Sequence, residues 1–363
     1  MPFSRCALGV SLPASRESFG LVQALRGIAA LWVVLFHARE HVSFHNWFLD
    51  LGNNGVAIFF ALSGFVIAHS IRGDAITAGY IGRFALRRSI RLDPAYWASI
   101  VLFLAFAWLS ALAKHEAFIG PTCGQLISNL TYTQIFVGQP SINTVYWTLT
   151  YEVQFYVVLV VCVMAAQRCG PLVYLVPFAI ALLFGPRLIE SPVPGLFVDR
   201  WHCFFLGALA YWSHERREAR IGFAILACAV LLLNPSPFNV IATATAFGLM
   251  VARETGAIAY SPKWLLLLGA ISYSLYLTHN PITGAAFFVA YKVGMPEWLA
   301  MIVSIALCLM VATAFWWAIE RPTMAVAKRI KMNAPLPSIR SVSEPTMHIA
   351  SAAEAQPDSV SRN

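Results

Sequence analysis

The feature that most constrains this chain is that apolar residues run through its whole length while charged residues are few. Of its 363 residues, 59% are hydrophobic and 12% are charged, whereas a soluble domain carries about 25% charged residues. This composition excludes a disordered chain, a soluble globule and an enzyme held by a single anchor. Because a spanning helix needs about 20 mostly apolar residues, there is room for about ten spans. We therefore expect an all-α, polytopic helical bundle embedded in a membrane.

Ten apolar segments are the predicted spans, with boundaries uncertain by several residues. They are residues 21–38, 54–71, 94–113, 147–166, 171–185, 200–213, 221–233, 238–252, 264–288 and 298–318. The segment from Leu126 to Val137 is too short and too polar to span, so we expect a re-entrant or interfacial piece. These segments define a transmembrane domain over residues 21–322. A cytosolic segment, 1–20, precedes it, and a basic and then disordered cytosolic tail, 323–363, follows it.

The lysines and arginines predict the orientation of the bundle. The formal charge of +8 comes from short basic clusters between apolar runs, which is the pattern of cytosolic loops and not of a nucleic-acid-binding protein. With both termini in the cytosol, the outer side receives only Arg39, Lys114, Arg187, Arg200 and Lys292. We expect a multi-pass membrane protein in contact with lipids, with no nucleic acid partner; the resemblance described below implies that the membrane is the bacterial inner membrane.

Ionisable residues within spans cost about 2.5–3.5 kcal/mol on insertion scales, so they are functional candidates. Arg26 and His37 lie on the first span with ten residues between them, about 16 Å along a helix. A snorkelling arginine and an interfacial histidine are the alternative interpretation. Glu152, on the fourth span, falls toward the outer end, as His37 does. A carboxylate beside an imidazole is the arrangement that general-base catalysis uses, so we predict that His37 and Glu152 act together.

Two further polar groups stand out. Tyr276 forms a polar stripe with Tyr273 and Asn280 on the ninth span, which is also consistent with a hydrogen-bonded seam between helices. His279 lies toward the outer half of the same span. Arg88 and Arg91 belong to a cytosolic cluster and are three residues apart, so both can face one phosphate-rich ligand. The alternative for this pair is ordinary positive-inside charge that binds anionic lipid.

Six short motifs, in this order, resemble one known family. They are the Arg26-to-His37 spacing; Gly55-Val56 with Phe59-Phe60 and Ser63-Gly64-Phe65; Arg88-x-x-Arg91; Trp147-Thr148-Leu149 with Glu152 and Phe155-Tyr156; Ser272-Tyr273-Ser274-Leu275-Tyr276 with His279; and Glu320-Arg321-Pro322. Together they resemble the membrane-bound acyltransferase family 3, bacterial glycan O-acyltransferases. The resemblance covers about residues 20–322, and the tyrosine-rich form around Glu152 is most similar to exopolysaccharide-modifying members.

The resemblance implies transfer of an acyl group, usually acetyl, from cytosolic acyl-CoA to a sugar hydroxyl of an exopolysaccharide, lipopolysaccharide or lipo-oligosaccharide. It implies that His37 and Arg26 are the essential pair, that Glu152 is the acidic site residue, and that Arg88 and Arg91 bind the CoA phosphates. Tyr276, His279 and Trp147 are weaker candidates for binding the sugar or the oxyanion, and no metal is expected. Whether His37 acts as a general base or carries the acyl group stays open.

Two other interpretations compete with this one. A multi-span transporter or flippase of a glycan or small molecule also places polar residues inside a bundle, although we find no matching pair of Gly/Pro-broken spans. The string from His37 to His41 also fits H-x-x-E-H, an inverted zinc-protease signature. His45 or Asp50 would then supply the third ligand. Acyl-CoA dependence separates the enzyme from the transporter.

Overall fold

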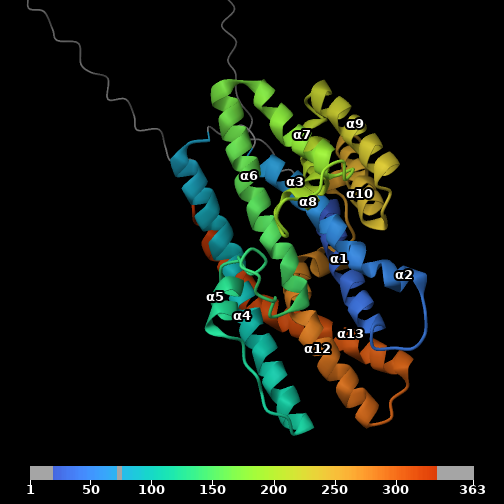
Figure 1. Ribbon diagram of the computed structural model, residues 1–363. Coiled ribbons are helices and arrows are strands. Elements are labelled where there is room, and N and C mark those ends of the chain that lie inside the picture. The colour runs from blue at the N-terminus through green and yellow to red at the C-terminus, as the bar shows by residue number, and fades with distance from the viewer. Residues whose placement is uncertain (1–18, 72–75, 333–363) are drawn as a thin grey trace, which may run out of the picture.

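The computed structural model describes residues 19–71 and 76–332, and within these ranges the chain is helical with no β-strand. Figure 1 shows a bundle in which α1 (Gly20–Arg39) runs through the centre. It packs against α3 (Gly55–Ser70), α11 (Lys263–Ala270), α12 (Ser272–Lys292) and α13 (Glu297–Phe315). The short helices α2 (Trp47–Asp50) and η1 (Leu51–Asn54) connect α1 to α3. Arg26 and His37 thus lie on a helix surrounded by others.

A second group of helices follows in the middle of the chain. It comprises α6 (Trp147–Cys169), η3 (Pro171–Tyr174), α7 (Leu175–Phe184), α8 (Val198–Trp212), α9 (Arg217–Leu233) and α10 (Pro237–Glu254). The contact between α3 and α8 joins this group to the first. An added Cβ on Gly64 would lie 1.8 Å from the carbonyl oxygen of Phe204, and one on Gly207 would lie 1.9 Å from that of Ala61. Only glycine permits this close approach of two membrane helices.

Aromatic side chains fill the space between α3, α6 and α8. The ring of Phe204 stacks on Phe60 at 4.4 Å and on Phe155 at 4.0 Å between centroids, and Phe155 also contacts Trp201 at 4.8 Å. All four side chains are buried. Because Phe60 and Phe155 belong to two of the sequence motifs, part of each motif serves packing and not chemistry.

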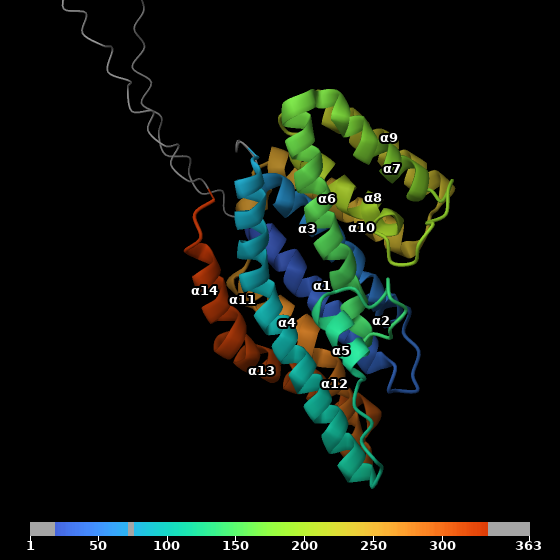
Figure 2. The ribbon, with the colours of Figure 1, turned by 60° about the vertical axis from the view of Figure 1, so that its left-hand side comes forward.

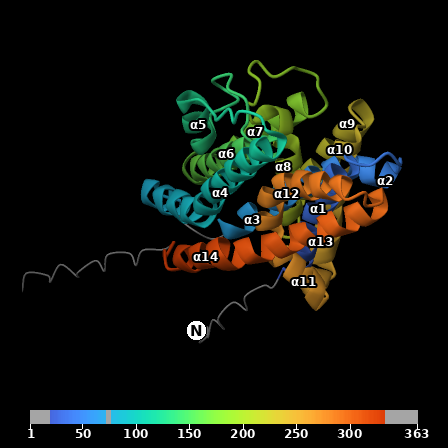
Figure 3. The ribbon, with the colours of Figure 1, turned by 90° about the horizontal axis from the view of Figure 1, so that it is seen from below.

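The remaining helices border the bundle. They are α4 (Ala78–Lys114), α5 (Cys123–Leu130), the short η2 (Thr144–Tyr146) and η4 (Ala257–Ala259), the π-helical turn η5 (Trp316–Glu320) and α14 (Arg321–Lys328). Figure 2 shows α14 beside α4, against which it packs. Figure 3 shows α13 and α14 as one long rod beneath α1. Gln23, in the first turns of α1, and Lys328, the last residue of α14, line the same cavity, so the described chain begins and ends on one side of the bundle.

The predicted all-α bundle agrees with this architecture, but ten spans are not confirmed. Five helical segments are long and apolar enough to cross a membrane: Gly20–Arg39, Trp47–Ser70, Ala78–Lys114, Thr144–Cys169 and Glu297–Lys328. The predicted span 264–288 is two helices that meet at Ile271. A hydropathy pattern detects only that a stretch is apolar. It cannot detect the break between two helices at Ile271, because the break does not change how apolar the stretch is.

Two predicted boundaries also move. The span predicted to start at residue 94 is the C-terminal part of the 37-residue helix α4. Thr77 caps the start of this helix by accepting a hydrogen bond from the amide of Tyr80. The boundary predicted at residue 322 falls inside a helical rod that continues to Lys328. The disordered tail expected after Asn333 and most of the N-terminal segment 1–20 lie outside the described residues.

Candidate functional site

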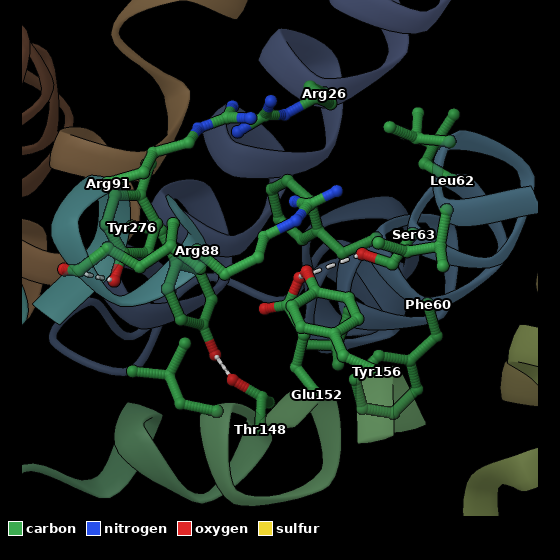
Figure 4. Close-up of a pocket in the computed structure, with 17 residues that line it drawn as sticks. Arg26, Phe60, Leu62, Ser63, Arg88, Arg91, Thr148, Glu152, Tyr156 and Tyr276 are labelled. Atoms are coloured by element: carbon green, nitrogen blue, oxygen red, sulfur yellow. Dashed lines mark hydrogen bonds between the residues drawn. The ribbon is translucent and has the colours of Figure 1, made fainter. Parts of the chain in front are cut away.

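A cavity of about 100 Å³ lies inside the bundle where α1, α3, α4, α6 and α12 meet. Its polar lining gathers residues from all five helices, as Figure 4 shows. They are Arg26 from α1, Ser63 from α3, Arg88 and Arg91 from α4, Thr148, Glu152 and Tyr156 from α6, and Tyr273 and Tyr276 from α12. We call this the central cavity. Five of the eight residues predicted for the site are therefore brought together in one place.

Glu152 is held in the central cavity by two hydroxyl groups. The Oγ of Ser63 donates to Oε1 of Glu152 at 3.0 Å, and the hydroxyl of Tyr156, one turn further along α6, donates to the same oxygen. The close packing of Gly64 against α8 fixes the neighbouring Ser63 in reach of the carboxylate. The motif Ser63-Gly64 thus combines a packing residue with a hydrogen-bond donor.

Three guanidinium groups face this single carboxylate. The Arg88 guanidinium carbon lies 4.8 Å from the ring centroid of Tyr156 and 5.4 Å from that of Phe84, a cation–π arrangement that favours a positive charge in a partly apolar site. Arg26 and Arg91 point into the opposite side of the cavity in Figure 4. Among residues 19–71 and 76–332, none of the three arginines forms an ion pair. The central cavity therefore carries an excess of positive charge.

Two further cavities share Arg26 and Arg91 with the central one. The first, of about 330 Å³, is also lined by Arg87, Glu320 and Lys328, and the second, of about 320 Å³, by the start of α1. We call them the entrance cavities. The carboxylate of Glu320 accepts two hydrogen bonds from Ser274, one from the backbone amide at 3.2 Å and one from the side-chain hydroxyl at 2.6 Å. Arg26 and Arg91 thus stand between the central cavity and the side where the described chain begins and ends.

The arginine pair was predicted in a basic cluster ahead of the span that starts at residue 94, whereas in the structure the pair and that span share one helix. Arg88 and Arg91 lie within helix α4, which starts at Ala78. Their spacing of three residues turns both toward the central cavity, as the sequence predicted for a shared ligand. The helix begins earlier than hydropathy indicated because charged residues on its inner face are covered by neighbouring helices.

His37 lies at the other end of α1, and its carboxylate partner is Glu40. Its Nδ1 is 2.9 Å from Oε2 of Glu40, three residues later. Since a carboxylate only accepts, Nδ1 of His37 donates this hydrogen bond. The ring of His37 is 5.1 Å from that of His279, which is in turn 6.0 Å from the ring of Tyr276. A row of three rings thus leads from the central cavity to His37.

His279 is fully buried, and its protonation can be assigned from its partners. Its Nδ1 contacts the carbonyl oxygens of Tyr276 at 2.8 Å and Leu275 at 3.1 Å, so Nδ1 donates. Its Nε2 is buried without a partner in the part of the chain that the structure describes. His279 therefore presents a free acceptor next to His37.

The predicted unit of His37 and Glu152 is not formed. Tyr276 donates to the carbonyl oxygen of Val145 at 2.8 Å and contacts the hydroxyl of Thr148 at 2.9 Å, which places Tyr276 level with the start of α6. Glu152 lies one turn inward of Thr148, and His279 one turn outward of Tyr276, a separation of about 10 Å along the helix axes. Counting residues from span ends missed this because the predicted span begins at residue 147, whereas the apolar helical segment already begins with η2 at Thr144.

The remaining candidates lie outside the central cavity. Trp147 packs edge-on against Phe60 and Tyr151, with ring centroids 6.3 and 5.7 Å apart. The residues of the zinc interpretation do not converge: His41 stacks on Phe287, and Arg39 binds both His45 and Asp50. Burial lowers the pKa of His41, while the charge of Glu40 opposes this shift. No group of three metal-ligating side chains occurs within the described ranges.

Sequence reasoning assigned no role to four of the residues that shape these sites. Ser63, Tyr156 and Glu320 were present in the motifs, yet only the tertiary structure shows what each one binds. Glu40 was named only as part of the zinc string. A spacing of three residues from His37 could have indicated it, because residues at i and i+3 face each other on a helix.

The fold and the central cavity define a membrane-embedded helical protein with a charged internal site. The model of the family described as an acyltransferase domain matches residues 21–320. The chain therefore belongs to this acyltransferase family and is an acyltransferase. This membership supports the enzyme interpretation over the transporter.

Several curated proteins are similar to this chain over most of its length. The exopolysaccharide production protein ExoZ of Rhizobium meliloti is 23% identical, over 84% of this chain and 98% of its own. Nodulation protein 10 of Rhizobium leguminosarum bv. viciae is 26% identical, over 87% and 97%. The putative membrane-bound transacylase BcsY of Komagataeibacter xylinus is 26% identical, over 79% of both chains. No solved structure matches the chain.

Proposed function

We propose that this protein is an inner-membrane O-acyltransferase that moves an acyl group from cytosolic acyl-CoA to a hydroxyl of an exopolysaccharide or a related glycan. One observation carries the proposal. The central cavity holds three guanidiniums that form no ion pair within the described residues; it shares Arg26 and Arg91 with the two entrance cavities, and a row of rings leads from its other side to His37. The names of the relatives favour an exopolysaccharide acceptor. Acetyl is the acyl group that the family resemblance implies.

The donor enters from the side of the entrance cavities, which we place in the cytosol together with both termini. Acyl-CoA is a polyanion, and Arg26, Arg87, Arg91 and Lys328 line the larger entrance cavity. Guanidinium groups bind phosphate oxygens through paired, charge-assisted hydrogen bonds. The phosphates lie there, and the pantetheine arm extends past Arg26 toward the outer end of the bundle, a distance of about 16 Å on α1.

The acceptor hydroxyl arrives from the outer side, next to His37 and His279. His37 Nε2 removes the hydroxyl proton while Glu40 holds the proton on Nδ1 and stabilises the imidazolium. The sugar oxygen bonds to the acyl carbon, the carbon–sulfur bond breaks, and the thiolate of CoA takes the proton from His37. The free Nε2 of His279 orients the sugar by accepting a hydrogen bond from a second hydroxyl of the sugar.

Purified protein in nanodiscs tests the donor. Acyl-CoA labelled in its acyl group is supplied with glycan from a deletion strain, and label in the glycan is measured together with free CoA. We expect both products to appear in equal amounts, and both to fall together in Arg88→Ala/Arg91→Ala when acyl-CoA is below saturation. Arg168→Ala is the matched control, because Arg168 is exposed at the end of α6 and lines none of these cavities. Glycan movement without CoA release would favour a transporter.

A further inference from the structure

A second cavity, larger than the central one, lies between α4 and α6. It has a volume of about 280 Å³. From α4 it is lined by Ile81, Phe84, Ala85, Arg88, Ser89, Leu92 and Asp93, and from α6 by Leu149, Glu152, Val153, Tyr156, Val157 and Val160. These residues follow i, i+3, i+4 and i+7 spacing, so each helix contributes one complete face. We call this cavity the lateral groove.

The groove exists because α4 and α6 pack against different partners. Helix α4 packs against α12 and α14, whereas α6 packs against α3 and α8. Figure 2 shows the two helices running beside each other along one side of the bundle. At the outer end the groove is closed by Tyr132, whose hydroxyl donates to Asp93 at 2.9 Å. Val157 and Val153, which line the groove, are 57% and 38% exposed, so the groove opens sideways onto the lipid-facing surface.

The wall between the lateral groove and the central cavity carries the charged groups Arg88 and Glu152, and the part of the groove toward the start of α4 is apolar. Arg88, Leu92, Leu149, Glu152, Tyr156 and Tyr273 line both spaces. From Arg88 back toward the start of α4, the lining consists of Ile81, Phe84, Ala85, Val157 and Val160. This apolar part extends about 10 Å along α4. It lies on the same side as the entrance cavities, because α4 begins there.

We propose that the lateral groove binds the acyl chain of the donor and selects acyl groups longer than acetyl. This inference rests on the proposed function and adds a first binding position to it, in which the acyl-CoA thioester lies in the central cavity beside Arg88 and Glu152 before the pantetheine arm carries it outward to His37. A two-carbon group does not reach the apolar residues beyond that wall. A longer chain turns from the wall into the groove and removes its methylenes from water.

Position favours an acyl chain over the lipid carrier of a glycan. The acceptor sugar comes from the outer side, whereas the apolar part of the groove runs from Glu152 toward the donor side. Its outer end is sealed by the hydrogen bond between Tyr132 and Asp93. A carrier lipid whose sugar reached His37 would have to cross this seal. The groove is therefore continuous with the donor path and not with the acceptor path.

Calorimetric binding of CoA, acetyl-CoA, butyryl-CoA, hexanoyl-CoA and octanoyl-CoA to the full chain in nanodiscs tests the proposal, with partition into empty nanodiscs subtracted. Each methylene that enters the groove strengthens binding about fourfold, and the gain levels off once the chain outgrows the groove. In Ala85→Phe, where a ring fills the groove, the longer donors bind no more tightly than acetyl-CoA. Val157→Phe fills it from the opposite helix and gives the same result.

Ala105→Phe is the matched control, because Ala105 is exposed on the same helix and lines neither cavity. This variant keeps the full dependence on chain length, and CoA binding reports that each variant is folded. Equal affinity for all chain lengths in the wild type, or an unchanged gain in Ala85→Phe and Val157→Phe, overturns the groove assignment while leaving acyl-CoA as donor. Absence of CoA binding in the wild type instead overturns the proposed function.

Discussion

The inner and outer ends of the site are built in different ways. In the central cavity, five helices bring charged side chains together, and two of these charges have partners from another helix: Arg88 lies over the ring of Tyr156, and Glu152 accepts a hydrogen bond from Ser63. At the outer end, His37 takes its carboxylate from Glu40 on the next turn of its own chain segment, and 55% of the Glu40 side chain is exposed. Charges at the inner end thus depend on assembly of the whole bundle, whereas the outer pair is local. This difference fits a charged donor on one side and a neutral sugar on the other.

Loss of the imidazole at the outer end has the largest expected effect. His37→Ala lowers kcat by roughly 10²–10⁴-fold, the usual contribution of a general base, with little change in the KM for acyl-CoA. Labelled acyl transfer in nanodiscs measures this. His41→Ala, whose ring stacks on Phe287, keeps most of the activity. A normally inserted His37→Ala that works at the wild-type rate contradicts the mechanism.

Loss of charge at the inner end has the second-largest expected effect, and it weakens acyl-CoA binding instead of lowering kcat. Arg88→Ala/Arg91→Ala weakens acyl-CoA binding by roughly 10–100-fold, because hydrogen bonds to charged groups contribute about 1.5–3 kcal/mol. Equilibrium binding measures it, with Arg168→Ala as control. The double lysine variant separates charge from bidentate geometry. Unchanged affinity in the alanine pair ends the donor assignment.

Double-mutant cycles test directly whether the two ends are separate. Glu40→Gln adds little to His37→Ala, because groups that act as a unit lose activity only once. For Glu152→Gln and His37→Ala, the loss of transition-state free energy in the double variant instead equals the sum of the two single losses within about 0.3–0.5 kcal/mol, as expected for distant sites. The measurement is kcat/KM of the wild type, the three single variants and the two double variants. Strong coupling between His37 and Glu152 would restore the unit that the sequence suggested.

The contact between the two ends gives the smallest effect. Tyr276→Phe removes a hydroxyl that bonds Val145 and Thr148, which costs about 0.5–1.5 kcal/mol. Thermal unfolding in detergent detects this loss. Tyr260→Phe serves as the control, because Tyr260 is 75% exposed and its loss leaves the melting temperature unchanged. Equal shifts in both variants would show that the Tyr276 hydroxyl does not join α12 to α6.

The amino-acid sequence by itself determined the class of the fold and the chemical inventory of the site. Apolar stretches of span length leave the backbone no alternative to helices in a membrane, and the predicted span 21–38 matches α1 within a residue at each end. Spacing along one helix was equally reliable. Arg88 and Arg91 face one cavity because three residues nearly complete a helical turn.

The tertiary structure decided which residues on different helices meet. Residue counting placed Glu152 and His37 at one depth, but depth along a helix contains no information about its rotation or about its neighbours. The glycines at the α3–α8 contact direct Ser63 to Glu152, and the separation of α4 from α6 leaves the lateral groove. Both features result from how side chains of distant segments fill space together. Periodicity within one segment therefore predicts its faces, whereas the partners of each face follow only from packing.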